Sequence, residues 1–179
     1  MWQPITIHLS GFIRAISVDS DAAFLVLPKA RSQYAGYFRM LDDAKKPHRH
    51  LYNGPLLIEC KTIKNVVSSA AEAETTGVFN NAKLVVSIRN ILNQLGHSQP
   101  VTVINTDNST TSGFVNKNIQ LKKSKSWDMH LHWLRDRENR NQFKVNWLKG
   151  KDIKADYFTK HHSIVHHRRT RPKYVRDNN

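Results

Sequence analysis

The sequence predicts an α/β fold with the element order βββαβααβα, and three features of its apolar pattern indicate it. Three strand-like segments, near residues 15–26, 32–41 and 55–63, come first, and short polar connections favour an antiparallel meander. A long helical stretch follows them. Strand-like and helical segments then alternate toward the end of the chain.

The helical stretch starts near Ser69 and stops before Gly96, where "GHSQP" predicts a terminating turn. With Ser69 as the N-cap, Glu72 falls at position N3 and can reach back to the backbone N–H of Ser69, completing a Ser-x-x-Glu capping box. The helix face that continues from Glu72 is polar and is expected to face water. It carries Thr76, Asn80, Lys83, Ser87 and Asn90.

Glu74 begins a different face of this helix, which is apolar and is expected to pack on the sheet. That face carries Val78, Ala82, Val85 and Leu92. The side chain of Glu74 is therefore predicted to point inward, where a carboxylate needs a partner or a metal. The alternative is a half-exposed glutamate that the helix macrodipole favours.

The second half of the chain supplies the remaining elements. "VTVINTDN" predicts a buried strand of β-branched residues, and "TTSGFVNKN" predicts a short helix. A helix near residues 125–138 has Trp127, Leu131 and Leu134 on one face. The last strand, "QFKVNWLKG", alternates apolar and polar residues, and a final helix is expected to start near Asp152.

The bulk composition predicts one intracellular domain. The chain has 179 residues, of which 39% are hydrophobic, enough for a real core. Its single cysteine, Cys60, excludes an internal disulfide and lies in the strand-like run "LLIECKTIK", where a buried reduced thiol is expected. We find no export signal and no run of about 18 apolar residues, so we expect a cytoplasmic or nuclear protein with no membrane partner.

The positive charge is concentrated in the last third of the chain. Residues 1–116 carry 11 Lys and Arg against 8 Asp and Glu, whereas residues 117–179 carry 17 against 6. Solubility alone does not require this asymmetry, so it indicates a polyanionic partner, most simply nucleic acid. The alternative is a solvated cationic surface with a disordered tail.

Acidic residues are scarce, with 14 in total, so those beside apolar strands are candidate ligands. Asp19 and Asp21 share one face of the first strand, and strand parity does not separate them. Asp107 ends the fourth strand, where an Asx turn or a helix cap is the alternative. Asp156 lies in the first turn of the last helix, where it can simply complement the helix dipole.

Carboxylates that converge at one end of a sheet can perform a known chemistry. They hold two divalent cations about 4 Å apart, which activate a water and stabilise the leaving oxygen in phosphodiester hydrolysis. Oxygen ligands favour Mg²⁺ or Mn²⁺ over zinc. A basic surface beside such a site would hold the phosphate backbone.

Four motifs then stand in a distinctive order: "SDAAF" at 20–24, "SSAAEAE" at 68–74, "TDNST" at 106–110 and "ADYFTK" at 155–160. Together with the segment "SKSWDMHLHWLRD", they resemble the ribonuclease H domain that ends the polyprotein of copia-type LTR retrotransposons. The resemblance covers roughly residues 16–161.

The resemblance implies a ribonuclease H-like fold, with a five-stranded mixed sheet flanked by helices. It implies a catalytic, metal-binding site of four carboxylates: Asp21, Glu74, Asp107 and Asp156. It therefore favours Asp21 over Asp19. The implied activity is endonucleolytic cleavage of the RNA strand of RNA/DNA hybrids. The implied cofactor is a pair of Mg²⁺ or Mn²⁺ ions.

The resemblance also divides the chain. Residues 1–15 are expected to be a remnant of an upstream connection, residues 16–161 the ribonuclease H-like domain, and residues 162–179 a basic tail. The resemblance also implies a partner, which is an upstream reverse transcriptase domain of the same polyprotein. Contacts to the hybrid are expected from a basic loop between two helices and from the tail. The residues are Lys117, Lys122, Lys123, Lys125, Arg168 and Arg169.

Three alternatives remain beside this hypothesis. The chain could be an inactive nucleic-acid-binding remnant of a retroelement, although all four acids are present. An integrase-like transposase shares the fold but places its glutamate last, whereas Glu74 comes second here. His162 and His166 are one helical turn apart, but no cysteine or acid accompanies them to form a zinc site, so a cationic tail on the phosphate backbone is favoured.

Overall fold

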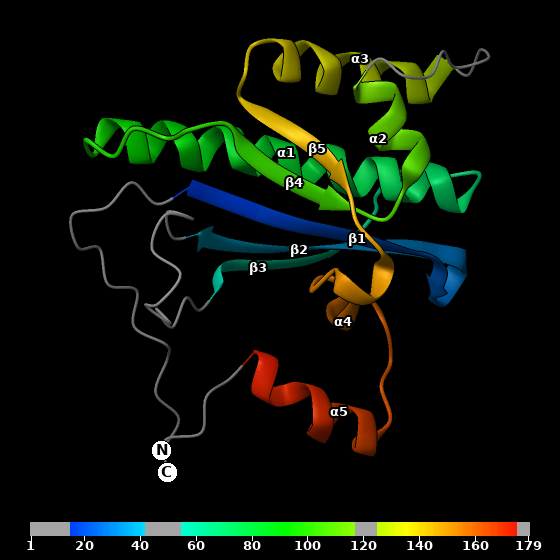
Figure 1. The fold of residues 1–179 in the computed structure, drawn as a ribbon. Coiled ribbons are helices and arrows are strands. Elements are labelled where there is room, and N and C mark those ends of the chain that lie inside the picture. The colour runs from blue at the N-terminus through cyan, green and yellow to red at the C-terminus, as the bar shows by residue number, and fades with distance from the viewer. Residues whose placement is uncertain (1–14, 42–54, 117–124, 175–179) are drawn as a thin grey trace.

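The computed structural model describes residues 15–41, 55–116 and 125–174, in which a five-stranded mixed sheet carries helices on both faces (Figure 1). The strands are β1 (Ala15–Leu27), β2 (Arg31–Leu41), β3 (Pro55–Thr62), β4 (Thr102–Thr106) and β5 (Phe143–Trp147). Their order is β3-β2-β1-β4-β5. The β1–β2 and β2–β3 pairs are antiparallel, and the β1–β4 and β4–β5 pairs are parallel. The predicted meander followed by parallel strands is confirmed.

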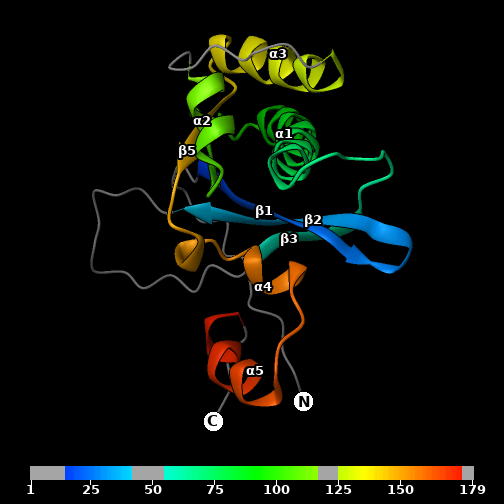
Figure 2. The same ribbon diagram turned by 90° about the vertical axis from the view of Figure 1, so that its right-hand side faces the viewer.

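The helices form two layers that enclose the sheet. They are α1 (Ala70–Gln94), α2 (Ser109–Val115), α3 (Lys125–Asn139), α4 (Asp156–Thr159) and α5 (Ile164–Thr170). Figure 2 shows α1, α2 and α3 over one face of the sheet and α4 and α5 beyond the other. Three single 3₁₀ turns complete the described elements: η1 (Pro28–Ala30), η2 (Gly150–Asp152) and η3 (Arg171–Lys173).

The main core lies between the sheet and the layer of α1, α2 and α3. It joins Val18 and Phe38 of the sheet to the apolar stripe of α1, in which Val78, Ala82 and Val85 are fully buried. The predicted inward face of this helix is therefore confirmed. The buried α3 residues are Leu131 and Leu134, also as predicted, while the side chain of Trp127 lies outside the described residues.

The start of α1 follows the predicted cap with two differences. Ser69 is the N-cap, and its hydroxyl accepts from the backbone N–H of Glu72 at 3.1 Å. The Glu72 carboxylate accepts from the N–H and the hydroxyl of Ser68, each at 2.7 Å, one residue earlier than predicted, because Ser68 presents both donors together. Thr76, expected to face water, is buried, and its hydroxyl donates to the Glu72 carbonyl at 2.8 Å.

The chain after β5 differs from the prediction. No helix starts at Asp152: the 3₁₀ turn η2 ends there, and buried Ile153 is extended, so α4 begins only at Asp156. The segment expected to be a tail contains α5, which the sequence analysis did not predict. A second, smaller core fixes this region on the far face of the sheet, where Tyr37 packs with Ile153 and Tyr174.

Two further features concern the chain's environment. Cys60 was expected to be buried, but it is exposed, because β3 forms the edge of the sheet. In the ranges that the structure describes, no helix is long and apolar enough to cross a membrane.

Candidate metal centre

Three carboxylates from separate elements meet at one end of the sheet. Asp21 lies in β1, Glu74 in the second turn of α1, and Asp107 directly after β4. One oxygen from each lies within 4.8 Å of the others. We refer to Asp21, Glu74 and Asp107 as the carboxylate cluster. Within the described residues, it is the one group of three or more acids, histidines or cysteines close enough to hold a metal ion.

Backbone geometry brings the cluster together. The parallel register of β1 and β4 pairs Asp19 with Asn105, and an aspartate follows two residues further on in each case: Asp21 within β1 and Asp107 directly after β4. Gly77 lets α1 approach β1 closely, because a Cβ atom there would lie 3.2 Å from the Cβ of Tyr34 and 3.5 Å from the carbonyl oxygen of Asp21. The helix can therefore bring its glutamate to the strand ends.

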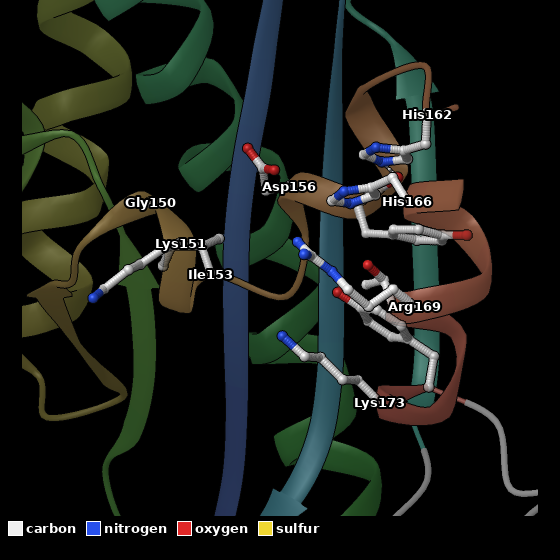
Figure 3. Close-up of a pocket in the computed structure, with 11 residues that line it drawn as sticks. Gly150, Lys151, Ile153, Asp156, His162, His166, Arg169 and Lys173 are labelled. Atoms are coloured by element: carbon white, nitrogen blue, oxygen red, sulfur yellow. Dashed lines mark hydrogen bonds between the residues drawn. The ribbon is translucent and has the colours of Figure 1, made fainter. Parts of the chain in front are cut away.

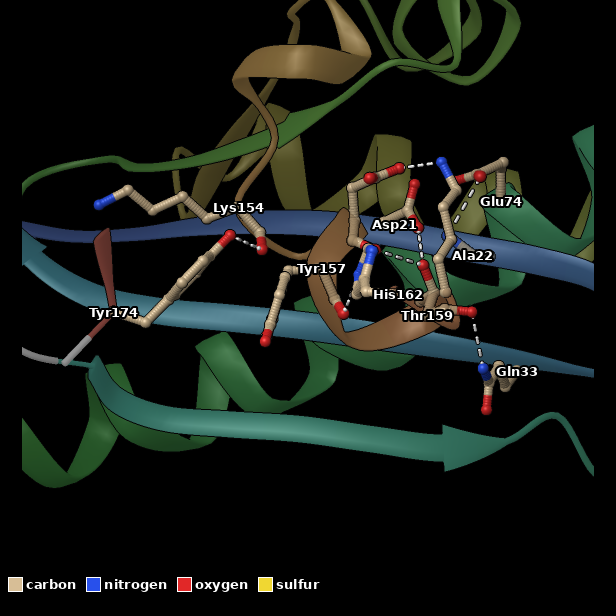
Figure 4. Close-up of polar contacts among 11 residues, drawn as sticks. Asp21, Ala22, Gln33, Glu74, Lys154, Tyr157, Thr159, His162 and Tyr174 are labelled. Atoms are coloured by element: carbon tan, nitrogen blue, oxygen red, sulfur yellow. Dashed lines mark hydrogen bonds and ion pairs between the residues drawn. The ribbon is translucent and has the colours of Figure 1, made fainter. Parts of the chain in front are cut away.

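Glu74 has one satisfied and one unsatisfied oxygen. Oε1 accepts from the backbone N–H of Ala22 at 3.1 Å (Figure 4), whereas Oε2 is buried with no hydrogen-bond partner among the described residues. Burial raises the pKa of this carboxyl to about 9, and repulsion from Asp21 and Asp107 adds to the shift. A buried oxygen without a donor, beside two other acids, is the arrangement that a cation would stabilise.

Asp21 is 3% exposed and is held in place by α4. The hydroxyl of Thr159 donates to its Oδ2, and the Thr159 carbonyl accepts from Gln33 of β2 at 2.8 Å (Figure 4). The pKa of Asp21 is raised to about 6, mainly by burial and also by repulsion from Asp156 and Asp107, while the Thr159 hydrogen bond and Lys160 oppose the shift. The carboxylate is thus oriented by one donor but crowded by like charge.

Asp107 is exposed and free of the capping role that was its alternative. The N-cap of α2 is Asn108, whose side chain accepts from the N–H of Thr111 at 3.0 Å. The backbone carbonyl of Asp107 accepts from the indole N–H of Trp147 at 2.9 Å. A Cβ atom on Gly150 would lie 2.8 Å from Asp107 Oδ2, so the absence of a side chain at Gly150 makes room for this carboxylate.

Asp156, the fourth predicted acid, is near the cluster but is not part of it. It begins α4, and its carboxylate forms an ion pair with Lys160 one turn later. It is close enough that its charge raises the pKa of Asp21. The structure therefore brings three of the four predicted acids together and places the fourth beside them, neutralised by a lysine.

Asp19 is the strand acid that the residue pattern could not separate from Asp21, and its carboxylate has other partners. It is fully buried and pairs with Arg39 at 2.8 Å. It also accepts from the Asn105 side chain at 2.7 Å and from the N–H of Lys154 at 3.2 Å. These contacts use both oxygens to join four segments of the chain, so Asp19 has a structural role.

The predicted hybrid-binding residues are only partly described. Lys117, Lys122 and Lys123 lie outside the described residues, as does the side chain of Lys125. The tail arginines, Arg168 and Arg169, lie on α5, and both are exposed. Of these two, Arg169 lines a pocket beside Asp156 and Arg168 does not.

Four residues that shape the site were not predicted from the sequence to have a role. Thr159 and Lys160 stand in the quoted motif "ADYFTK", but their partners are invisible in a local pattern: Thr159 bonds an aspartate 138 positions away. Gly77 and Gly150 act through the space that they leave. Apart from the motif, the sequence carried no signal for any of them.

The cluster fits a divalent cation. Its donors are all carboxylate oxygens, which suit Mg²⁺ or Mn²⁺. One of these oxygens is buried without a partner among the described residues, and burial together with mutual repulsion raises the pKa values of Asp21 and Glu74, although Lys160 partly opposes the shift.

Comparisons with known proteins identify the fold. No protein-family model and no curated protein matches the chain. Many solved structures are similar to it, among them the following three. LC11-RNase H1 in complex with an RNA/DNA hybrid has a TM-score of 0.56 at 10% identity, over 80% of this chain and 92% of that one.

The other two come from a bacterium and a virus. The N-terminal RNase H domain of Rv2228c from Mycobacterium tuberculosis has a TM-score of 0.55 at 12% identity, over 82% of this chain and 91% of that one. A foamy viral protease-reverse transcriptase in complex with dsDNA has a TM-score of 0.53 at 12% identity, over 86% and 96%. The chain thus has a ribonuclease H-like fold.

Proposed function

We propose that this chain is a metal-dependent endonuclease that hydrolyses the RNA strand of RNA/DNA hybrids. The observation that carries the proposal is the buried, unpartnered Glu74 Oε2 facing Asp21 and Asp107 at the end of a ribonuclease H-like sheet. A buried carboxylate without a partner destabilises the fold, so its presence beside two other acids indicates a functional role. The likeness to LC11-RNase H1, which was solved with an RNA/DNA hybrid, supports this substrate class.

Each acid has a distinct part in this function. Asp21, oriented by Thr159, and Glu74, oriented by the N–H of Ala22, form the inner wall of the site. Asp107 closes the cluster from the exposed side, where substrate arrives. Two divalent ions, when bound, would supply a nucleophilic water and neutralise charge on the scissile phosphate. Asp156, which pairs with Lys160 in this structure, would supply a fourth carboxylate beside these ions.

We extend this proposal to the evolutionary origin of the chain and to its partners. The four motifs support descent from a copia-type LTR retrotransposon polyprotein, and the likeness to a foamy viral protease-reverse transcriptase supports an upstream reverse transcriptase partner. The basic loop residues Lys117, Lys122, Lys123 and Lys125 are proposed to grip the hybrid. We expect a cytoplasmic or nuclear location, in keeping with the unpaired thiol of Cys60.

A cleavage assay on an end-labelled RNA/DNA hybrid, with and without Mg²⁺ or Mn²⁺, tests the proposal. We expect metal-dependent cleavage of the RNA strand, reduced at least 100-fold by Glu74→Gln and by Asp107→Asn, because each removes a ligand charge. Asp152→Asn, which removes an exposed acid outside the cluster, serves as the matched control and should keep full activity. A wild-type chain that binds the hybrid but leaves it intact with both metals is the inactive remnant.

A further inference from the structure

A pocket of about 280 Å³ lies beside the carboxylate cluster, between α4 and the segment formed by α5 and η3 (Figure 3). Asp156 and Ile153 line it on one side, and Arg169 and Lys173 on the other. Its volume is just below the roughly 300–1,000 Å³ of sites for drug-sized ligands, so it suits a small group.

The far wall of this pocket is anchored to the sheet. Tyr174 packs edge-on against Tyr37 of β2, with ring centroids 5.7 Å apart, and against Phe158 of α4 at 5.4 Å. Its hydroxyl donates to the carbonyl oxygen of Lys154 at 2.9 Å. These contacts hold η3 against the rest of the domain, so the cations of this segment lie at a built site.

Two of the cations have no counter-ion in the part of the chain that the structure describes. Neither Arg169 nor Lys173 has a side-chain hydrogen bond or ion pair within the described residues, and both extend toward the α4 side in Figure 3. Lys151, which also lines the pocket, points away from them. Asp156 is the one acid among the described lining residues, and Lys160 already pairs with it. The pocket therefore has an unbalanced positive charge.

Other occupants fit this pocket less well. The ring of Tyr157 already stacks on His162 at 4.6 Å and on Tyr174 at 4.9 Å, so it is not available to a nucleobase. The rings of His162 and His166 stack on each other at 4.5 Å and 14°, and no third metal-ligating side chain completes a group with them in the described chain. A phosphate suits the two free cations, because guanidinium and ammonium groups bind phosphate oxygens strongly.

We propose that this pocket holds a backbone phosphate of the nucleic-acid strand that lies across the carboxylate cluster. The inference rests on the proposed function and adds a second point of attachment to it. Asp156 borders both the pocket and the cluster, so a phosphate between Arg169 and Lys173 fixes the strand beside the scissile position. Arg168, on the same helix but outside the pocket lining, has no part in this contact.

Hybrid binding without divalent metal tests the inference separately from cleavage. Fluorescence anisotropy of a labelled RNA/DNA hybrid, in EDTA and at several salt concentrations, compares wild type with Arg169→Gln/Lys173→Gln. We expect about tenfold weaker binding and a log–log salt slope smaller by one to two, because each lost phosphate contact lowers the slope by about one. Arg140→Gln/Lys144→Gln removes the same two charges at the far end of β5 and α3 and should leave both quantities near wild type.

A second readout uses inorganic pyrophosphate and amide NMR shifts. Saturable shifts around Arg169 and Lys173 that disappear in the double variant support the pocket. An unchanged salt slope in that variant overturns the inference, even if pyrophosphate binds, because the site then takes free phosphate only. If the double variant lowers the salt slope as expected but the wild type does not cleave, the proposed function is overturned and the phosphate pocket stands.

Discussion

Glu72 and Glu74 lie two residues apart at the start of α1, and their carboxylates have different surroundings. Glu72 accepts two hydrogen bonds from Ser68 at the helix start. Glu74 instead faces the sheet, and its Oε2 has no donor among the described residues. A rotation of about 200° around the helix axis separates the two positions, since successive residues are about 100° apart. The carboxylate of Glu72 therefore stabilises the helix, and that of Glu74 belongs to the carboxylate cluster.

Gly150→Ala tests whether Asp107 binds metal. A methyl group 2.8 Å from Asp107 Oδ2 forces that carboxylate to rotate, and the end of an exposed side chain can do so at little cost to the fold. We expect Mg²⁺ affinity, measured by titration calorimetry, to fall about tenfold, while the free energy of unfolding in EDTA changes by less than about 0.5 kcal/mol. Unchanged Mg²⁺ affinity would show that the position of Asp107 does not matter to the metal.

At the scale of elements, α1 is tied to the sheet by a buried side chain. The amide of Asn81 donates to the hydroxyl of Ser20 at 2.9 Å and to the carbonyl of Ala35 at 3.0 Å, which links the helix to β1 and β2 together. A Cβ atom on Gly36 would lie only 2.3 Å from Asn81 Oδ1. This close contact sets the distance between α1 and the sheet, and hence the position of Glu74.

Gly36→Ala is therefore expected to lower the free energy of unfolding by roughly 1–3 kcal/mol, because it overpacks the contact and displaces a hydrogen-bonded amide. Urea denaturation measures the effect. In an Asn81→Ala background the same substitution should cost less, since two of the three atoms that it collides with are gone and only the ring of Phe38, 2.7 Å away, stays. Equal costs in the two backgrounds would show that the contact is not responsible.

For the whole molecule, ionisation of the carboxylate cluster destabilises the folded state when no metal is bound. The folded-state pKa is raised from 3.8 to about 6 for Asp21 and from 4.5 to about 9 for Glu74. At a pH between the unfolded-state and folded-state pKa values of these groups, the folded chain holds more protons than the unfolded chain. The contribution of both groups to stability is therefore present at low pH and is lost as pH rises from about 4 to about 9.

We expect this loss to appear in urea denaturation in EDTA at pH 5, 7 and 9. Glu74→Gln removes the larger shift, so its stability should exceed that of wild type at pH 9 by roughly 1–3 kcal/mol, and the two should converge toward pH 5. Saturating Mg²⁺ should reverse the order at pH 8, because the ion stabilises the ionised cluster of wild type. A constant difference between the two proteins across this range would contradict the expectation.

Much of the fold could be predicted because its signals are local. The strand-like composition of β1, β2 and β3 and the 3.6-residue period of α1 can be read from neighbouring residues, and so can the N-cap at Ser69. The end of the chain was harder. Residues after β5 owe their conformation to packing of Ile153 and Tyr174 on the sheet, and no short window of sequence shows that contact.

The sequence by itself determined the order of the elements as far as β5 and the inward direction of Glu74, because both depend on spacing along one helix or strand. Only the tertiary structure decided how the other acids are used. Asp19 is paired with Arg39 and Asn105, and Asn108 caps α2, which leaves Asp21 and Asp107 to face Glu74. These choices depend on partners up to 86 positions away along the chain, so they exist only once β1, β2 and β4 lie side by side.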